Sequence, residues 1–432
     1  MAKGRPGTYA HSRRRRGTVV NSSQTMEEIN FFQKLPLELV HMILDNLSVL
    51  EVSKLCLAST QMNRCVVDYI STHAWKNKMM HHSYHYISCP EQECLSGHFR
   101  DLGVLFKRCT MLLPTKERLK CVMYTFSQVP CFLQDSCSQP NCIGFFRYGI
   151  FLQTLIAGWD DLECQKVFSF LCEVTNLLRK IEAVTTNGKP GLKCNEELEL
   201  RYFCRKVLLD LSPHPSECRF WLLQLLRPWP LVSQAHLLLI LYGPQLATGP
   251  ISWQDLVEEV LPRNALVDLA KSIILVFNNP QNKKSSIQST LAIFEEITVI
   301  PQEWHVHNIA RLLVLCGHKL CYIILANKVQ SGQITSVATI IVFIILVFEK
   351  DYNKMNWVVN LVKQLHRSFS ISGQKLTFIR LLEYKCSDVM AQYLATYANG
   401  NRDENGETLL TASQLLTAIG RFHANILEGL LE

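Results

Sequence analysis

Residues 35–68 read LPLELVHMILDNLSVLEVSKLCLASTQMNRCVVD, and this stretch decides the fold of the N-terminal part of the chain. Pro36 suits the first helical position, where its missing N–H costs nothing, and Glu38 places a negative charge near the positive end of the helix dipole. Aliphatic side chains then recur at the spacing of one helix face: Leu35, Leu39, Val40, Ile43, Leu44 and Leu47. The stretch therefore begins with an amphipathic helix.

Two more short helices are expected in the same stretch. Ser48 can cap the second helix, and Glu51, three residues later, completes a capping box. Val52 and Leu55 contribute to the apolar side of that helix, and Ser59 or Thr60 can cap a third. A unit of about 40 residues cannot hide this many aliphatic side chains by itself. Either the rest of the chain covers the surplus or a partner does, because an exposed apolar patch marks an interaction site.

The pattern L-P-x-E-L-x-x-x-I-L-x-x-L-S-x-x-E-V-x-x-L-x-x-A-S resembles the F-box, the motif through which adaptor proteins dock on Skp1 in cullin-based ubiquitin ligases. The resemblance implies that the Leu-Pro start and the aliphatic residues after it pack into a helical groove of Skp1. The residues implied to bind Skp1 are Leu35, Pro36, Glu38, Leu39, Ile43, Leu44, Leu47, Val52 and Leu55.

This sequence departs from the F-box pattern mainly in the third helix. Met62 stands where the family usually has Trp, and Leu50 stands where Pro is common. Trp75 is a candidate for the family's distal Trp, displaced by a few residues. The departures affect the expected contacts of the third helix, whereas the first two helices match.

The rest of the chain repeats apolar residues at helical spacing, in segments separated by Pro and Gly, as at residues 187–191 and 227–230. No fixed repeat period is visible, although stacked helix pairs could form a solenoid. We therefore predict a mostly α fold, with an N-terminal F-box three-helix unit followed by an irregular or solenoid-like multi-helix domain. The expected boundaries are a disordered basic tail at 1–26, the F-box at 27–75, a loop-rich connector at 76–101 and a helical substrate-recognition or scaffold region at 102–432.

Composition and charge narrow the class of protein. Apolar residues make up 48% of the 432 residues and charged residues 19%, which excludes an intrinsically disordered chain. The net charge is +7, of which +6 belongs to residues 1–26. The nearly neutral remainder is a poor candidate for gripping a nucleic-acid backbone. The basic run at 13–16 can be a nuclear-import signal or a solubilising tail.

The N-terminal residues lack the apolar core of a secretory signal, so we expect a nuclear or cytoplasmic protein or both. The 17 cysteines then stay reduced, and Cys56, Cys172, Cys204 and Cys321 are expected to be small core residues. The most apolar stretch, Ile334–Phe348, is shorter than the roughly 20 residues that a membrane span needs. We predict a buried helix there and no membrane association.

Motifs for catalysis or cofactor binding were not found. The Cys/His-rich stretch from His81 to Cys142 lacks a C-x2-C pair, so incidental thiols are favoured over a zinc site. Residues 401–412 mimic half of a calcium loop, but Ala412 stands where a bidentate Glu is needed. The two carboxylates Asp160 and Asp161 are expected to cap the helix that follows rather than to act as an acid and a base. We therefore expect no enzyme activity, no cofactor and no bound metal.

The leading hypothesis is a non-catalytic, substrate-recognition subunit of a Skp1–cullin–F-box ubiquitin ligase. The alternative is a helical scaffold that binds Skp1 or other partners without directing degradation, and only the first hypothesis requires a cullin in the complex. Zinc-dependent nucleic-acid binding through residues 81–142 is a third, weaker hypothesis, tested by metal analysis. The sequence does not reveal the target protein, because signatures of leucine-rich or WD repeats are absent from it.

Overall fold

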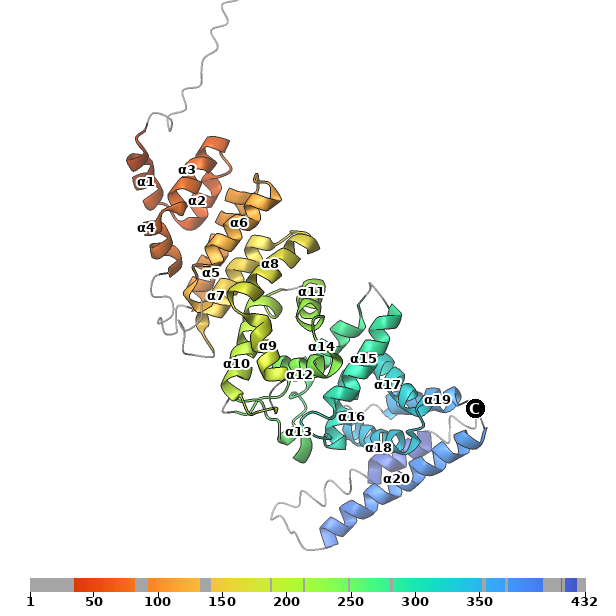
Figure 1. The fold of residues 1–432 in the computed structure, drawn as a ribbon. Helices are drawn as coiled ribbons and strands as arrows, with labels where there is room; N and C mark the ends of the chain where they lie inside the picture. Colours follow the sequence, from red (N-terminus) through yellow and green to blue (C-terminus); the bar gives the residue numbers. More distant parts are fainter. Residues whose placement is uncertain are drawn as a thin grey trace, which may run out of the picture.

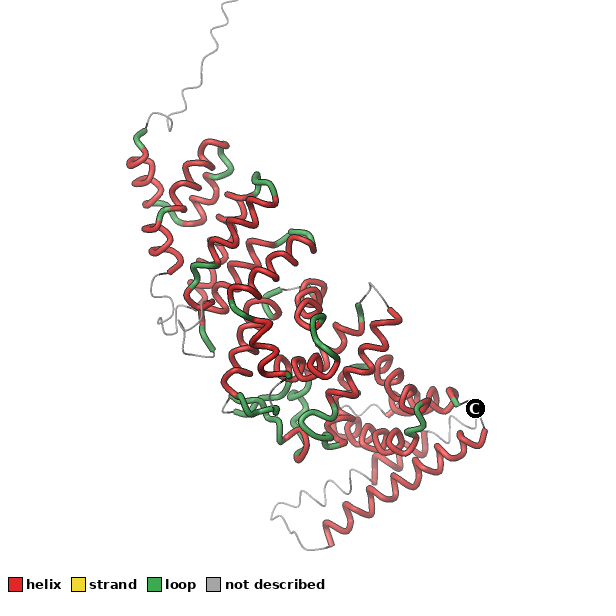
Figure 2. The backbone as a smooth tube through the Cα atoms, viewed as in Figure 1, coloured by secondary structure: helices red, strands yellow, loops and turns green. Residues whose placement is uncertain are grey.

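The computed structural model describes residues 35–81, 92–132, 141–186, 189–212, 214–247, 249–279, 283–351, 355–369, 372–398, 413 and 416–425. Within these ranges the chain consists of helices and the turns between them, with a single isolated bridge between Gln245 and Ile251 and no strand. Figure 2 shows this helical content along the whole body. The prediction of a mostly α fold is confirmed.

The helices fall into three successive groups. The N-terminal unit contains α1 (Leu37–Asp45), α2 (Val49–Leu55), α3 (Thr60–Ser71), α4 (His73–Lys76) and the π-helix η2 (Asn77–His81). The middle group contains α5 (Gln92–Thr110), α6 (Thr115–Phe126), η3 (Pro130–Phe132), α7 (Ile143–Ile156), α8 (Asp161–Val174), α9 (Leu177–Thr185), α10 (Cys194–Phe203), η4 (Cys204–Leu209), α11 (Pro215–Leu226) and α12 (Leu231–Tyr242). The last group contains α13 (Asp255–Glu258), α14 (Val267–Phe277), α15 (Lys283–Ile297), α16 (Val306–Leu315), α17 (His318–Gln330), α18 (Ile334–Asp351), α19 (Met355–Ser368) and α20 (Ser372–Ala398).

The helices stack in chain order along an elongated body, from α1 at one end to α20 near the other (Figure 1). Most of them pack on the second helix that follows: α5 on α7, α10 on α12, α12 on α14, α14 on α16, α16 on α18 and α18 on α20. Because each layer contacts mainly its neighbours, the body is organised as a solenoid rather than around one central core.

Local sequence signals determine where the N-terminal helices begin. The side chain of Ser48 accepts a hydrogen bond from the backbone N–H of Glu51, and the Glu51 carboxylate accepts one from the N–H of Ser48, which forms the predicted capping box. Ser59 caps α3 by accepting a hydrogen bond from Met62 at 3.0 Å. Pro36 lies one position earlier than predicted: it is the N-cap of α1, and its carbonyl accepts hydrogen bonds from Leu39 and Val40.

The predicted loop-rich connector at 76–101 is helical at both ends. It begins in η2, and its last ten residues belong to α5, whereas residues 82–91 lie outside the described part. Phe99 and Leu102 are fully buried, together with Leu105 one turn later. Helical spacing therefore extends across the boundary that the sequence analysis placed at residue 102.

The most apolar helix, α18, is the centre of the C-terminal layers. Seven of its side chains are completely buried: Val337, Ala338, Ile341, Val342, Ile344, Ile345 and Val347. The helix packs on α16, α19 and α20, so neighbouring helices cover its apolar surface. Among the described helices, none has the length and apolar character that crossing a membrane requires. The predicted buried helix is thus confirmed.

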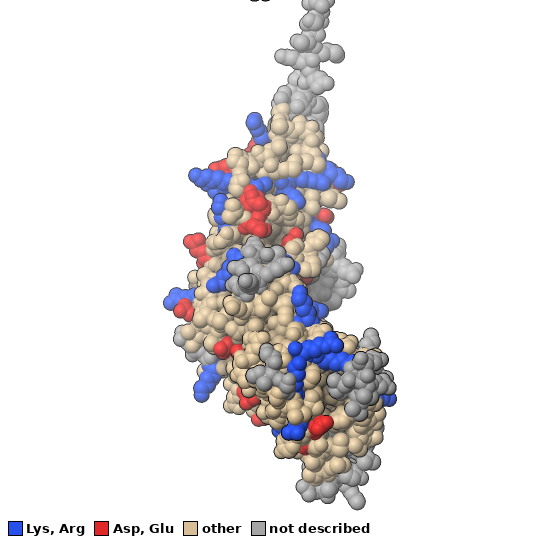
Figure 3. Space-filling model, turned by 90° about the vertical axis from the view of Figure 1, so that its right-hand side faces the viewer, with Lys and Arg blue, Asp and Glu red and all other residues tan. Residues whose placement is uncertain are grey.

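Charged side chains are scattered over the surface. Figure 3 shows Lys and Arg interspersed with Asp and Glu on one face, between larger uncharged areas. The four cysteines predicted as core residues are all buried: Cys56, Cys172, Cys204 and Cys321. The cysteines that the structure describes are all free thiols.

Candidate functional site

Helix α1 lies at the end of the stack (Figure 1), and its apolar stripe is only partly covered. Val40 and Leu44 point into the protein and are 3% and 2% exposed. Leu39, Met42 and Ile43 are 44%, 61% and 40% exposed. At 100° per residue Met42 lies about 160° from Val40, with Leu39 and Ile43 between them, so one part of the stripe is buried and the adjoining part is open. We call Leu39, Met42 and Ile43 the open face of α1.

Helix α2 and the turn after it divide in the same way. Val49, Val52 and Ser53 are buried, whereas Leu50 and Leu57 are exposed. Arg108 of α5 donates a hydrogen bond to the hydroxyl of Ser53 at 2.8 Å, which ties α2 to the body. The apolar side chains of α2 are therefore covered where this helix meets the body and exposed elsewhere.

The nine residues implied to bind Skp1 occupy three environments. Pro36, Glu38, Leu39 and Ile43 are exposed, and Leu35, Leu47 and Leu55 are half-buried. Leu44 and Val52 are buried in the protein's own core. The prediction that they contact Skp1 directly is therefore corrected for these two side chains. Sequence reasoning could not separate Leu44 from Leu39 and Ile43, because all three belong to one apolar stripe of α1.

Sequence reasoning also missed several exposed residues of the same unit: Leu37, Met42, Leu50 and Leu57. Met42 is the most exposed aliphatic side chain of α1 at 61%. The signal that identifies it is its helical position, three residues after Leu39 and on the side opposite Val40. Burial of Val40 fixes which side of the helix is free.

Polar contacts hold α1 against α3. The hydroxyl of Tyr69 donates a hydrogen bond of 2.6 Å to Asp45 at the end of α1. Burial, and next the Asp45 carboxylate, raise the pKa of Tyr69 far above its ordinary value, so the phenol stays protonated and keeps donating. The ring of Tyr69 also lies 5.3 Å from that of His41. The orientation of the open face is thus set by contacts on the buried side.

The N-terminal unit is firmly joined to the body. Trp75 is 4% exposed, and its ring centre lies 6.2 Å from those of Tyr69 in α3 and Phe106 in α5. The sulfur atoms of Cys56, just after α2, and Cys109 of α5 are 3.3 Å apart. The predicted distal Trp is therefore the residue that packs the N-terminal unit onto the body. A partner on the open face is held at a fixed place relative to the solenoid.

Comparison with known proteins identifies the family. F-box only protein 47 of Mus musculus is 38% identical over 415 residues, covering 95% of this chain and 92% of the mouse protein. F-box only protein 47 of Homo sapiens is 37% identical over 415 residues, covering 95% and 91%. The chain belongs to the F-box only protein 47 family. No solved structure matches it.

A family model described as "FBXO47, ARM repeats" matches residues 173–405. This match decides between the two forms of the helical body that the sequence left open: over these residues it is solenoid-like. It begins near the end of α8 and extends beyond α20, so it includes most of the stacked layers. F-box proteins are generally non-catalytic adaptors, and the matches indicate no enzyme family.

Asp160, His305 and two buried cysteines are groups of the kind that catalysis or metal binding uses, and here they have structural roles. Asp160 caps α8 by accepting a hydrogen bond from the N–H of Glu163 at 2.7 Å, as predicted. His305 caps α16, and burial lowers the pKa of its imidazole. Burial raises the pKa of Cys172 and Cys316 to about 12, which leaves these thiols protonated and unreactive.

Part of the zinc candidate and the whole calcium candidate fall outside the described residues. These are His82, His85, Cys89 and Cys137 of the first and residues 401–412 of the second. In the described ranges, no three His, Cys, Asp or Glu side chains are grouped so that they could hold a metal ion.

Proposed function

We propose that this protein is a substrate-recognition adaptor of a Skp1–cullin–F-box ubiquitin ligase. The open face of α1 docks in a helical groove of Skp1, and the ARM-repeat body presents a target protein for ubiquitination. The observation that carries the proposal is that Leu39, Met42 and Ile43 are exposed while the same helix is anchored through Val40 and Leu44. An exposed aliphatic surface on a rigid helix suits helix-in-groove recognition.

The energy available from this face is substantial. Complete burial of one aliphatic side chain contributes about 1.5–3 kcal/mol, and these side chains are already about half covered. Burying the remaining surface of the three contributes about 3 kcal/mol, roughly a hundredfold in affinity. The open face can therefore decide whether the partner is held, together with contacts from the half-buried Leu35 and Leu47.

No bond is made or broken by the adaptor in this proposal. Binding a target on the body while Skp1 holds α1 raises the concentration of that target near the ubiquitin-loaded enzyme. The rigid junction through Trp75 supports this role, because it fixes the distance between the docking face and the solenoid.

The test uses the full chain with the double substitution Leu39→Asp and Ile43→Asp. These exposed positions should tolerate the change, so the protein should keep its helical circular dichroism and lose Skp1 co-purification by at least tenfold. The control is Leu376→Asp on α20, a leucine of similar exposure at 53% far along the chain. Undiminished Skp1 capture by the double variant would refute docking through α1.

The same preparations separate the adaptor from the scaffold alternative. An adaptor retains a cullin together with Skp1, and both should be lost in the double variant. Capture of Skp1 without a cullin would favour the scaffold that binds Skp1 for another purpose.

A further inference from the structure

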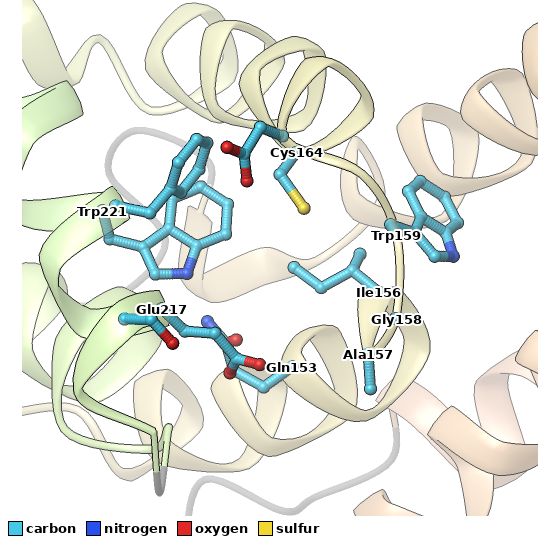
Figure 4. A pocket seen from close by; sticks show the side chains of 11 residues that line it. Gln153, Ile156, Ala157, Gly158, Trp159, Cys164, Glu217 and Trp221 are labelled. Atoms are coloured by element: carbon cyan, nitrogen blue, oxygen red, sulfur yellow. The ribbon is translucent and has the colours of Figure 1, made fainter. Parts of the chain in front are cut away.

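A groove lies beside the turn from α7 to α8 and continues between α8 and α11. It consists of two adjoining hollows of about 140 and 340 Å³, which share Asp161, Ser216 and Phe220 as lining residues. Figure 4 shows the first hollow, with side chains from α7, α8 and α11 around it. Residues of α1 to α4 do not line it, so the proposed Skp1 contact leaves it open.

The first hollow is acidic and has an apolar floor. Trp221 and Ile156 are buried beneath it, and the sulfur of Cys164 is directed into it (Figure 4). Asp161 and Glu217 line its sides. Burial, and then the nearby carboxylates, raise the pKa of the Cys164 thiol to about 12, so the thiol is uncharged and the carboxylates carry the charge of this hollow. This hollow is suited to a cationic group on an aliphatic stem.

The second hollow is lined mainly by cationic side chains. Arg219 of α11 and Arg227, directly after α11, line it together with Asp161, which the two hollows share. Leu162, on the α8 side of the groove, is 70% exposed. This hollow therefore offers the positive charge of Arg219 and apolar surface to an acidic group.

Asp161 and Arg219 carry opposite charges but do not pair with each other. Among the described residues, the side chains of Asp161 and Arg219 form no ion pair. Glu163, which also faces Cys164, is paired instead with Arg118. Asp161 and Arg219 are therefore available to a ligand that carries both charges.

The length of the groove limits the ligand. Glu217 in α11 and Arg227, the residue directly after α11, are ten residues apart, about 15 Å at 1.5 Å per residue. An extended peptide advances about 3.3 Å per residue, so four or five residues fill the groove. The two charged positions lie closer together, because Glu217 and Arg219 are two residues apart on α11. A peptide with a basic and an acidic side chain two residues apart, which point to the same side of an extended chain, therefore matches the charge pattern.

We propose that this groove binds an extended segment of the target protein, with a Lys or Arg side chain entering between Asp161 and Glu217 and an Asp or Glu side chain meeting Arg219. The segment's identity as part of a target rests on the proposed adaptor function, whereas peptide binding itself does not require Skp1. Leu162, Phe220 and Leu223 provide the apolar contact between the two charged positions.

The test uses three fluorescein-labelled peptides and the full chain in a fluorescence-anisotropy titration. They share the frame Ser-Gly-Leu-X-Leu-Z-Leu-Gly-Ser, with X and Z as Lys and Glu, both Lys, or both Glu. The peptide with both charges should bind at least fivefold more tightly than the peptide with two Lys or the peptide with two Glu. Its affinity should fall as the salt concentration rises. Equal binding of the three, or no saturable binding up to 1 mM, would overturn the proposal.

Two variants test which groove residues contact the basic and the acidic side chain of the peptide. Asp161→Asn with Glu217→Gln should weaken binding of the peptide with Lys and Glu (the mixed peptide) at least fivefold. Binding of the peptide with two Glu should be unchanged or tighter. Arg219→Gln should weaken the mixed peptide and leave the peptide with two Lys unchanged. The control Asp68→Asn with Glu303→Gln removes two exposed carboxylates outside the groove. Unchanged peptide binding in the groove variants would contradict the assignment.

The two proposals fail separately. Groove variants should still capture Skp1 as the unaltered protein does, and Leu39→Asp with Ile43→Asp should still bind the mixed peptide. A variant that loses Skp1 capture but still binds the peptide reports on the docking face alone. A variant that captures Skp1 but no longer binds the peptide reports on the groove alone.

Discussion

Single residues decide how the N-terminal unit is attached. Trp75 stands in the short helix α4, where sequence alone identified it only as a displaced family Trp. Its ring lies between Tyr69 and Phe106, so it contacts helices on both sides of the junction. The adjacent thiols of Cys56 and Cys109 show how closely α2 and α5 approach. A change at Trp75 should therefore affect folding of the junction rather than docking chemistry.

Trp75→Ala is expected to lower the free energy of unfolding by about 3–5 kcal/mol, because a buried indole is lost and a cavity remains. Chemical denaturation followed by circular dichroism measures the change. Met111→Ala, at a residue that is 56% exposed, is the control and should stay within about 0.5 kcal/mol of the unaltered protein. A similar small effect at Trp75 would show that the junction does not depend on this ring.

At the scale of the element, short helices depend on their caps. The first three helices contain only 9, 7 and 12 residues, and isolated helices of this length are marginal in water. Ser48 and Ser59 satisfy backbone donors that would otherwise lack partners. Caps and tertiary packing together stabilise the helix on which the docking face depends.

Ser59→Ala should destabilise the protein by about 1 kcal/mol, because the N–H of Met62 loses its acceptor. Ser59→Asp, which restores an acceptor, should recover most of that loss. Thermal unfolding of the three proteins provides the measurement. Equal melting temperatures for the alanine and aspartate variants would argue against capping as the cause.

The capping box also makes a prediction about pH. The backbone N–H of Ser48, and next its hydroxyl, lower the pKa of Glu51 below its ordinary value. A lowered folded-state pKa contributes stability above the unfolded value and loses it as the pH falls through the folded value. The stability difference between the unaltered protein and Glu51→Gln should thus be present at pH 7 and shrink below about pH 4. A difference that does not change with pH would contradict this origin.

At the scale of the whole molecule, the N-terminal unit and the solenoid form one continuous stack. Val52, Cys56 and Trp75 are buried where α2 and α4 face α5, and α5 in turn packs on α7. Helices α7 and η4 approach so closely that a Cβ at Gly149 would lie 2.3 Å from the carbonyl oxygen of Lys206. The docking face is therefore the first layer of a larger structure.

A fragment of residues 35–81 alone should lack a cooperative thermal transition, because its inner face loses α5. A fragment of residues 35–212, which retains the middle layers, should unfold cooperatively. Circular dichroism on heating distinguishes the two. A sharp transition in the short fragment would show that the unit folds independently of the body.

Sequence alone determined the features that local chemistry controls. The caps at Ser48, Ser59 and Asp160, the helical class and the buried α18 follow from spacing and from residue type over short distances. The F-box resemblance depended on such local positions as well.

Tertiary structure alone decided which apolar residues are free. Leu39 and Leu44 are both leucines of one helix, but packing against α3 covers one side and leaves the other open. The helical ends of the connector and the groove between α8 and α11 also depend on contacts between residues far apart in the chain. The broad apolar stripe of an amphipathic helix carries no internal mark of which part the chain itself will bury, so only the position of its neighbours makes that choice.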